Sequence, residues 1–405
     1  MSQKRKIIFV IVSLYGGGAE KSLINLLHEF DYEKYEVDLL LFKKEGLFLN
    51  QVPEQVNLLE IPHDLDLMYR NSYKGSIRRI SDLKYVLTRF LGTGLVKVLP
   101  HKSVRARRQV RWKNFYRNAI GPFDREYDIA VAYLECEPTY YVLDKIRAGR
   151  KYVWVHNDYD STGLDSSYDY PYFRQADAVV TISDKCANIL RERFPEAAEK
   201  VWCIPNITTS KYIRELAAGE PDEPFREDRF KILSIGRLSE QKGFDMAVKA
   251  AHLLKQRGYR FEWIIIGEGE LKNELTERIN RYGLNDFVRL VGQKSNPYPY
   301  MRCCDFLAQT SRYEGKSVVL DEAKILSKPI LATRYPTVYD QLDEKTGLIV
   351  EMNPEAIADG MERLFLHPEL LEGMQRELEQ HDFGNTHEIS CYYELFESDV
   401  SGENE

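Results

Sequence analysis

Two glutamates in the stretch SRYEGKSVVLDEAKILSKPILA, residues 311–332, carry side chains that accept hydrogen bonds from sugar hydroxyls. Glu314 and Glu322 are eight positions apart, so in one continuous helix they would point about 80° from each other. Gly315 disfavours such a helix, because glycine loses more conformational entropy in a helix interior than other residues do. We therefore predict that Glu314 lies in a loop and that Glu322 lies about one turn inside the following helix.

The start of that helix is suited to an anion. The first N–H groups of a helix have no partner within it and carry a partial positive charge. The helix is predicted to begin at Lys316, Ser317, Val318 and Val319, so its free N–H groups, which suit a phosphate, lie between the two glutamates. With a hydroxyl acceptor on either side of the anion site, the segment predicts a clamp for a nucleotide sugar, holding a hexose, a diphosphate and a ribose.

A second loop, SIGRLSEQKGFD at residues 234–245, supplies cations after an apolar run that predicts a strand. Gly236 ends the run, and Arg237 and Lys242 precede the next predicted helix. Two cations in this position can hold a diphosphate and neutralise the charge that develops on it. Two exposed surface cations would explain the spacing equally well.

Two features of the N-terminal half also follow predicted strands. In SLYGGGAEKS, Gly17 and Gly18 let the backbone approach an anion at a helix start, although a tight structural turn is an equal alternative. The spacing is not the G-x-G-x-x-G of a dinucleotide fold. His156 follows the apolar run KYVWV, and its place at a strand end favours a functional role over a structural one.

The elements that must position these residues form two series. Apolar runs alternate with helix-period segments in 1–206 and again in 230–380, and the polar segment 207–229 between them indicates a linker. This alternation predicts an α/β fold of two doubly wound domains with ligands at the carboxyl ends of parallel strands, in a cleft. A length of 405 residues also favours two domains.

Composition narrows the class of protein. The six cysteines show no C-x-x-C or metal-ligand spacing, which favours a reduced, cytoplasmic compartment. The apolar run near the N-terminus is too short for an export signal, and no run approaches the roughly 20 residues of a membrane span.

Charge is unevenly distributed, since residues 64–125 carry fifteen Lys and Arg against four acids while the whole chain has a net charge of −7. This segment also contains Trp112, Phe115 and Tyr116. Basic residues interleaved with apolar ones favour contact with an anionic membrane surface or a phosphate, and a solvated pair of basic helices is the alternative. Nucleic acid is disfavoured as a partner because the rest of the chain is acidic.

Taken together, the motifs resemble the GT-B glycosyltransferases of the large retaining family 4 (glycosyl transferases group 1). The resemblance covers nearly the whole chain through GGGAEKSLINLL, VTIS, IPN, SIGRLSEQKGFD, IIGEGELKNEL, LVG and YEGKSVVLDEAKILSKPILAT. It implies two Rossmann-like domains facing across a cleft. Residues 1–206 would bind the acceptor, residues 230–380 the nucleotide sugar, and a helix in 381–405 would cross back to the first domain.

The resemblance also implies roles in the donor-binding domain. Glu314 would face the donor sugar, and Glu322 would accept from the ribose hydroxyls. Arg237 and Lys242, next to Gly236, would hold the diphosphate as leaving group. Three further positions belong to the donor site: the backbone of Ser317, Val318 and Val319. The nucleotide base would lie near Gly292 and Gln293.

From the first domain, Gly17 and Gly18 would approach the phosphates and His156 would contact the hexose. The catalytic group would then comprise Glu314, His156, Lys242 and Arg237. The family needs neither a metal nor a cofactor. Lys316 and Ser317 depart from the family pattern, which often has an aromatic residue and then Gly or Pro. Lys316 would add a cation beside the sugar or diphosphate in the donor site, so donor identity does not carry over.

The implied activity is transfer of a hexose or N-acetylhexosamine, with retention, from a nucleotide diphosphate sugar, with UDP-sugars the first expectation. The acceptor would be a glycan, in lipid-linked form, in bacterial surface-polysaccharide synthesis at the inner face of the plasma membrane. Two alternatives are a non-hydrolysing sugar-nucleotide epimerase, which would need more catalytic carboxylates and histidines in the cleft, and a non-catalytic scaffold.

Overall fold

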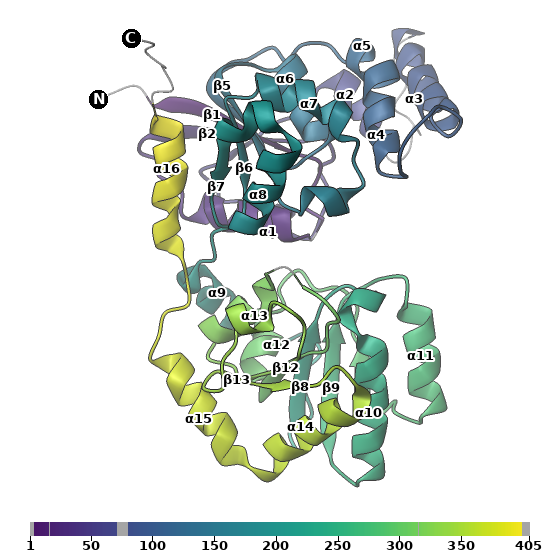
Figure 1. Ribbon diagram of the computed structural model, residues 1–405, viewed down its shortest axis with the longest axis vertical. Helices are drawn as coiled ribbons and strands as arrows, with labels where there is room; N and C mark the ends of the chain where they lie inside the picture. The colour runs from purple at the N-terminus through teal and green to yellow at the C-terminus, as the bar shows by residue number, and fades with distance from the viewer. Residues whose placement is uncertain (1–3, 16, 71–79, 315, 399–405) are drawn as a thin grey trace. The chain divides into compact units, whose positions relative to one another are not determined.

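The computed structural model describes residues 4–15, 17–70, 80–314 and 316–398. The chain divides into two compact units, each described here by itself. Unit 1 consists of Met1–Ile207 together with His387–Glu405, and unit 2 is Thr208–Thr386. Figure 1 shows the helices and strands of both units and labels many of them.

Unit 1 contains a parallel sheet of seven strands in the order β3-β2-β1-β4-β5-β6-β7. Ile7–Ile11 in β1 are buried at every position, which fits a parallel strand covered on both faces. The strands are β1 (Arg5–Ile11), β2 (Tyr35–Leu41), β3 (Asn57–Leu58), β4 (Glu126–Ala132), β5 (Arg147–Val155), β6 (Ala178–Thr181) and β7 (Val201–Cys203). The crossover helices are α1 (Gly18–His28), α6 (Glu137–Lys145), α7 (Ser166–Gln175) and α8 (Asp184–Arg193).

The basic segment forms a small helical insertion between β3 and β4. It comprises α2 (His63–Tyr69), α3 (Leu83–Leu95), α4 (Ala106–Arg111), the π-helical turn η3 (Trp112–Tyr116) and α5 (Arg117–Ala119), and residues 71–79 lie outside the described part. Trp112 and Tyr116 are fully buried and pack in the core of unit 1. The expectation that these two aromatic side chains contribute to a membrane-facing surface is therefore wrong, because both are buried in the core of unit 1.

Unit 2 contains a parallel sheet of six strands in the order β10-β9-β8-β11-β12-β13. Successive residues of β8 point to opposite faces, so Ile232 packs with α10 and α14 while Leu233 packs with α12 and α13. The strands are β8 (Phe230–Ile235), β9 (Phe261–Ile266), β10 (Val288–Leu290), β11 (Phe306–Gln309), β12 (Ile330–Thr333) and β13 (Gly347–Val350). The helices are α9 (Ser210–Ala217), α10 (Phe244–Gln256), α11 (Lys272–Arg281), α12 (Tyr298–Cys303), α13 (Val318–Ile325), α14 (Pro354–Leu366) and α15 (Pro368–Glu379).

Residues 207–229 were expected to form a linker, and the structure corrects this prediction. Ser210–Ala217 form helix α9, whose Thr209 side chain caps the N-terminus. Ile213 and Ala217 are buried against Tyr298 and Ile325 of unit 2. The segment is polar overall because only one face of α9 is apolar, and that face is covered by the domain that follows.

The last helix, α16 (Ile389–Glu397), belongs to unit 1 and packs on its sheet through aromatic rings. Tyr393 stacks on Tyr35 with 5.7 Å between ring centroids. Phe396 is fully buried and stacks on Tyr152 at 5.8 Å. Aromatic pairs of this kind contribute to stability beyond their buried area, so α16 is part of the core of unit 1.

We expect Phe396→Ala to lower the free energy of unfolding of unit 1 by about 3–5 kcal/mol, because it leaves a cavity between α16 and the sheet. Denaturant unfolding followed by tryptophan fluorescence measures this loss. Leu366→Ala, at an exposed position of α14, is the matched control and should change stability by about 0.5 kcal/mol or less. Equal effects of the two substitutions would contradict a structural role for α16.

Candidate active site

The two motifs predicted to bind the donor meet at one edge of the unit 2 sheet, because β8 and β11 are neighbouring parallel strands. Gly243 is the residue that lets the loops after these strands touch. Its φ of +64° lies in the left-handed region, and a Cβ there would overlap the carbonyl oxygen of Thr310. The Thr310 hydroxyl in turn donates to the Lys242 carbonyl oxygen at 3.0 Å.

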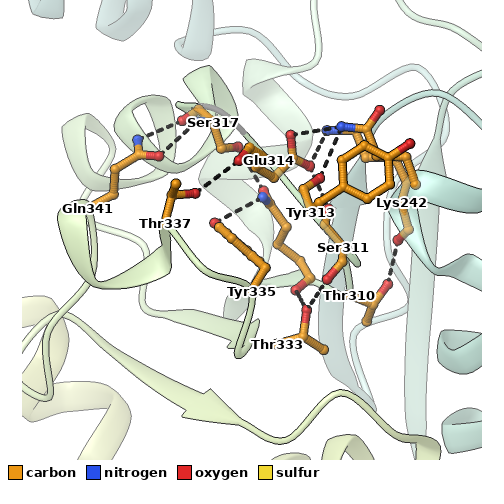
Figure 2. A network of polar contacts seen from close by, with 12 residues as sticks. Lys242, Thr310, Ser311, Tyr313, Glu314, Ser317, Thr333, Tyr335, Thr337 and Gln341 are labelled. Carbon is orange, nitrogen blue, oxygen red and sulfur yellow. Dashed lines mark hydrogen bonds and ion pairs between the residues drawn. The ribbon is translucent and has the colours of Figure 1, made fainter. Parts of the chain in front are cut away.

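Lys242 and Glu314 form an ion pair across these loops. Lys242 Nζ lies 2.6 Å from Glu314 Oε1, and the two side chains are 19% and 8% exposed. Ser311 Oγ donates to the same carboxylate oxygen at 2.6 Å (Figure 2). Lys242, which is predicted to hold the diphosphate, is thus in direct contact with Glu314, which is predicted to face the sugar.

The start of α13 is organised by a residue that the sequence analysis missed, Gln341, which follows the short turn η7 (Val338–Asp340). Its Oε1 accepts from the Ser317 N–H at 2.7 Å, and its Nε2 donates to the Ser317 carbonyl oxygen at 2.9 Å (Figure 2). Ser317 was expected to offer a free N–H to a phosphate, and this expectation is wrong because the Gln341 amide occupies that group. No local pattern around Gln341 indicates this contact. The roles of Val318 and Val319 stay predictions.

Residues after β12 fix the Glu314 loop from its other side. Thr337 Oγ1 donates to the Glu314 carbonyl oxygen at 3.0 Å, and Thr333 Oγ1 donates to the Ser311 carbonyl oxygen at 2.5 Å. Burial raises the pKa of Tyr335 above its ordinary value, and the nearby Glu314 charge acts in the same direction. Tyr335 is therefore a neutral phenol next to the loop, and the position of Glu314 is set from three strand ends.

Glu322 lies in α13 as predicted but is fully buried. Its Oε1 accepts from the Tyr298 hydroxyl at 3.1 Å. Burial and the Glu322 charge together raise the pKa of Tyr298 well above its ordinary value, so this phenol is a donor at any physiological pH. A ribose hydroxyl would reach Glu322 only after the surrounding side chains move apart, and the ribose role stays a prediction.

The remaining predicted donor residues of unit 2 lie at strand ends. Gly236 follows β8, and a Cβ there would come within 3.2 Å of the Lys242 side chain, so glycine leaves room for that lysine. Arg237 is exposed next to it. Gly292 follows β10 with a φ of +72°, and Gln293 is exposed beside it. Two strands, β9 and β8, lie between β10, which precedes Gly292, and β11, which precedes the Glu314 loop.

Lys316, the departure from the family pattern, is largely exposed. Its Nζ lies 3.7 Å from Asp321 Oδ2, in the first turn of α13. Such an exposed pair contributes little to stability. The ammonium group is therefore available to a ligand at low energetic cost, next to the Glu314 loop.

In unit 1, Gly17 is the N-cap of α1 and Gly18 its first residue. The Glu20 carboxylate folds back over Gly17, where a Cβ would overlap it. A glutamate at the third helical position often caps the N-terminus in this way. The anion site predicted at this loop thus already holds a carboxylate of the chain itself. Burial raises the pKa of Glu20, and the charge of Glu135 adds to this effect.

Glu135 was missed by the sequence analysis, although it directly follows the predicted strand YDIAVAYL. It is buried, and its carboxylate accepts from Asn157 Nδ2 at 2.8 Å and from the His156 N–H at 3.4 Å. The carboxyl edge of the unit 1 sheet therefore brings together His156 and two carboxylates, of Glu20 and Glu135, which can accept hydrogen bonds from hydroxyl groups.

His156 is buried at the end of β5, with its ring 4.8 Å from that of Tyr133. Burial lowers its pKa from 6.5 to about 4, against the opposing charge of Glu135. The imidazole is neutral at pH 7. It can hydrogen-bond a sugar hydroxyl, but it supplies no positive charge for a phosphate.

Among the described residues, no group of three or more His, Cys, Asp and Glu side chains is arranged to hold a metal ion. Independence from metal remains a prediction, because a substrate diphosphate can itself supply metal ligands.

We expect His156 to make the protein less stable in acid. The unfolded state takes up a proton at about pH 6.5 but the folded state only near pH 4, so stability falls as the pH drops through this window. His156→Gln removes the effect, which amounts to about 3 kcal/mol at most. Denaturant unfolding at a series of pH values measures it, with His367→Gln at an exposed site as control. Parallel curves for wild type and His156→Gln would contradict the buried neutral state.

We expect Gln341→Ala to leave the Ser317 N–H and carbonyl groups without this partner and to destabilise unit 2 by about 1–3 kcal/mol. Hydrogen exchange at the Ser317 amide should become faster. Gln375→Ala, at an exposed position of α15, is the matched control. Unchanged exchange at Ser317 would show that the Gln341 amide does not hold the start of α13.

Comparison with known proteins gives a family match within unit 2. Residues 219–381, within unit 2, match the family described as Glycosyl transferases group 1. A Campylobacter jejuni N-acetylgalactosamine-N,N'-diacetylbacillosaminyl-diphospho-undecaprenol 4-alpha-N-acetylgalactosaminyltransferase is 37% identical over 131 residues, which are 32% of this chain and 35% of that one. The matched segments span between 35% and 54% of the length of the first curated relatives that the chain matches.

Solved structures match both units. A variant of S. aureus TarM in complex with UDP superimposes with a TM-score of 0.64 at 15% identity, covering 97% of this chain and all of that one. Anabaena HepE in complex with UDP-glucose gives a TM-score of 0.59 at 16% identity, covering 96% and 99%. Both are GT-B glycosyltransferases. The chain therefore has the GT-B fold, and its residues 219–381 match the glycosyl transferases group 1 family.

Proposed function

We propose that the chain is a retaining glycosyltransferase of family 4 that moves a hexose or N-acetylhexosamine from a nucleotide diphosphate sugar to a glycan acceptor in bacterial polysaccharide synthesis. The observation that carries this proposal is the Lys242–Glu314 pair at the adjoining ends of β8 and β11, within the group 1 segment. A cation for the leaving group and an acceptor for sugar hydroxyls are what donor binding requires.

The ion pair also supports a way for the donor to enter. The Coulomb attraction of a largely buried pair is offset by the loss of hydration of both ions. Separating the pair would leave two largely buried charges without partners, which is costly, so the diphosphate would have to replace Glu314 on Lys242 as hydroxyls of the donor sugar reach Glu314. Glu314, still held by Ser311 and by its backbone, would then accept from the donor sugar.

In the proposed reaction the bond between the sugar C1 and the diphosphate oxygen breaks, and a bond from C1 to the acceptor oxygen forms on the same face. The acceptor proton passes to the departing diphosphate. Lys242, together with Arg237 from the same loop, would neutralise the charge that develops on the leaving group. Electrostatic stabilisation of this kind is the largest contribution to the rate enhancement of many enzymes. The protein would otherwise act by positioning, and no cofactor or metal is part of the proposal.

For the donor we propose a UDP-sugar, supported by the UDP and UDP-glucose bound in the TarM and HepE structures. For the acceptor we propose a lipid-linked glycan, supported by the diphospho-undecaprenol named for the Campylobacter relative. Such an acceptor implies work at the inner face of the plasma membrane. Among the helices of the described residues none is long and apolar enough to cross a membrane.

The test is a screen of nucleotide sugars for thermal stabilisation and for nucleotide release with and without a lipid-linked acceptor. We expect UDP-hexoses to stabilise the protein and to release UDP much faster when acceptor is present. Conversion of the donor sugar into an isomer without acceptor would establish an epimerase instead. Failure of every nucleotide sugar and nucleotide diphosphate to bind would favour a scaffold.

We expect Lys242→Ala to lower the rate of UDP release by on the order of 10²-fold or more, comparable with the loss of one preorganised donor in other enzymes. Lys249→Ala, at an exposed position of α10, is the matched control and should retain the wild-type rate. The melting temperature of both variants separates a catalytic loss from unfolding. A Lys242→Ala variant that turns over normally would remove Lys242 from the proposed mechanism.

A further inference from the structure

The helical insertion of unit 1 exposes an apolar surface. Of the twelve large hydrophobic side chains exposed among the described residues, eight lie between residues 80 and 104. We use the name α3 face for six of them, five on α3 and one just after it: Leu83, Leu87, Phe90, Leu91, Leu95 and Val98. Phe90 and Val98 are 75% and 80% exposed. Apolar side chains concentrated in this way mark a surface that contacts something else.

The exposure follows from how α3 packs. The buried side of the helix carries Gly92 and, just after its end, Val96. A Cβ at Gly92 would lie 3.4 Å from the Phe115 ring, so the small residue lets α3 approach η3 closely. The larger apolar residues recur at intervals of three and four on the other side, as in a helix with a continuous apolar stripe. Figure 1 shows α3 at the periphery of unit 1, away from the sheet.

The surroundings of the α3 face are strongly basic. Residues 80–119 contain ten Lys and Arg and one acid, Asp82, which is buried. Part of this charge is used inside the unit, since Arg108 and Arg111 both pair with the buried Glu137. Lys84, Lys97 and Lys113 are exposed. The partner of the α3 face must therefore accept apolar side chains and positive charge together.

Charge decides between the candidate partners. A second copy of the chain would bring the same excess of positive charge against this one, and like charges across an interface oppose association. An anionic bilayer offers an acyl region for the apolar side chains and negative headgroups for the cations around them. At thirteen residues, α3 is too short to span a bilayer, so it would lie in the plane of the interface.

We propose that the α3 face docks unit 1 on an anionic phospholipid surface, with the α3 face among the headgroups and Lys84, Lys97 and Lys113 as headgroup contacts. The surface differs from the one that the sequence predicted, because Trp112 and Tyr116 are core residues and the leucines and Phe90 of α3 provide the contact. The docking itself does not depend on glycosyl transfer, and only its benefit, presentation of a lipid-linked acceptor, rests on the proposed function.

The experiment is cosedimentation of the full chain with vesicles of phosphatidylcholine alone or mixed with phosphatidylglycerol, over a range of salt concentrations. We expect binding to the mixed vesicles that weakens as salt is added. Leu87→Ser with Phe90→Ser should lower the partition coefficient at least about tenfold, since two apolar side chains no longer leave water. Leu366→Ser, at an exposed position of α14, is the matched control and should bind like wild type.

A second variant tests the charge. Replacing Lys84, Lys97 and Lys113 by Gln should weaken binding to mixed vesicles and remove most of its salt dependence, while the fold, read from the melting temperature, stays unchanged. Absence of binding to mixed vesicles, or equal binding by wild type and Leu87→Ser with Phe90→Ser, would overturn the proposal. A concentration-dependent dimer that the serine variant loses, without vesicle binding, would assign the face to a second copy instead.

The two proposals can fail separately. UDP release with a soluble acceptor and no vesicles reports on the transferase alone, and we expect the serine variant to match wild type there. Normal turnover without vesicle binding would overturn the docking and leave the transferase. Vesicle binding without turnover of any nucleotide sugar would overturn the transferase and leave the docking.

Discussion

The contact between Lys242 and Glu314 is the interaction on which the candidate site depends. It joins the loops after β8 and β11, and those loops can touch only because Gly243 adopts a left-handed conformation against the Thr310 carbonyl. A largely buried ion pair adds little net stability, since desolvation offsets its attraction. The ion pair instead fixes the positions of the two side chains. The Lys242 ammonium and the Glu314 carboxylate lie 2.6 Å apart at the sheet edge where a doubly wound fold binds its ligands.

The rest of the unit 2 site restrains this pair. Thr337 and Thr333 hold the backbone of the Glu314 loop, and the Gln341 amide holds Ser317 at the start of α13. Side chains locked by such contacts lose little entropy when a ligand binds, which favours preorganised binding. The same contact also removes the Ser317 N–H from the groups that a phosphate could use, so cations carry a larger share of any diphosphate binding.

Unit 1 presents a different chemistry at its own sheet edge. Glu20 and Glu135 place two carboxylates beside a neutral His156, a set of hydrogen-bond acceptors suited to hydroxyl groups. The helical insertion, in contrast, is basic and apolar on its outside. Because the buried side of α3 carries the small residue Gly92, this helix can keep its larger apolar residues exposed without losing its packing on η3.

The sequence by itself determined the alternation of the main strands with helices, the two-unit α/β fold and the motifs at the strand ends, because periodicity and turn residues are local properties. Glu314 in a loop and Glu322 in a helix followed from their spacing in the same way. Tertiary structure alone decided the partners: Glu314 for Lys242, 72 positions away, and Gln341 for Ser317. It also buried Glu322 and Trp112, exposed Phe90 and turned a predicted linker into α9. A local pattern shows which side of an element is apolar, but whether that side is covered depends on residues far away in the chain.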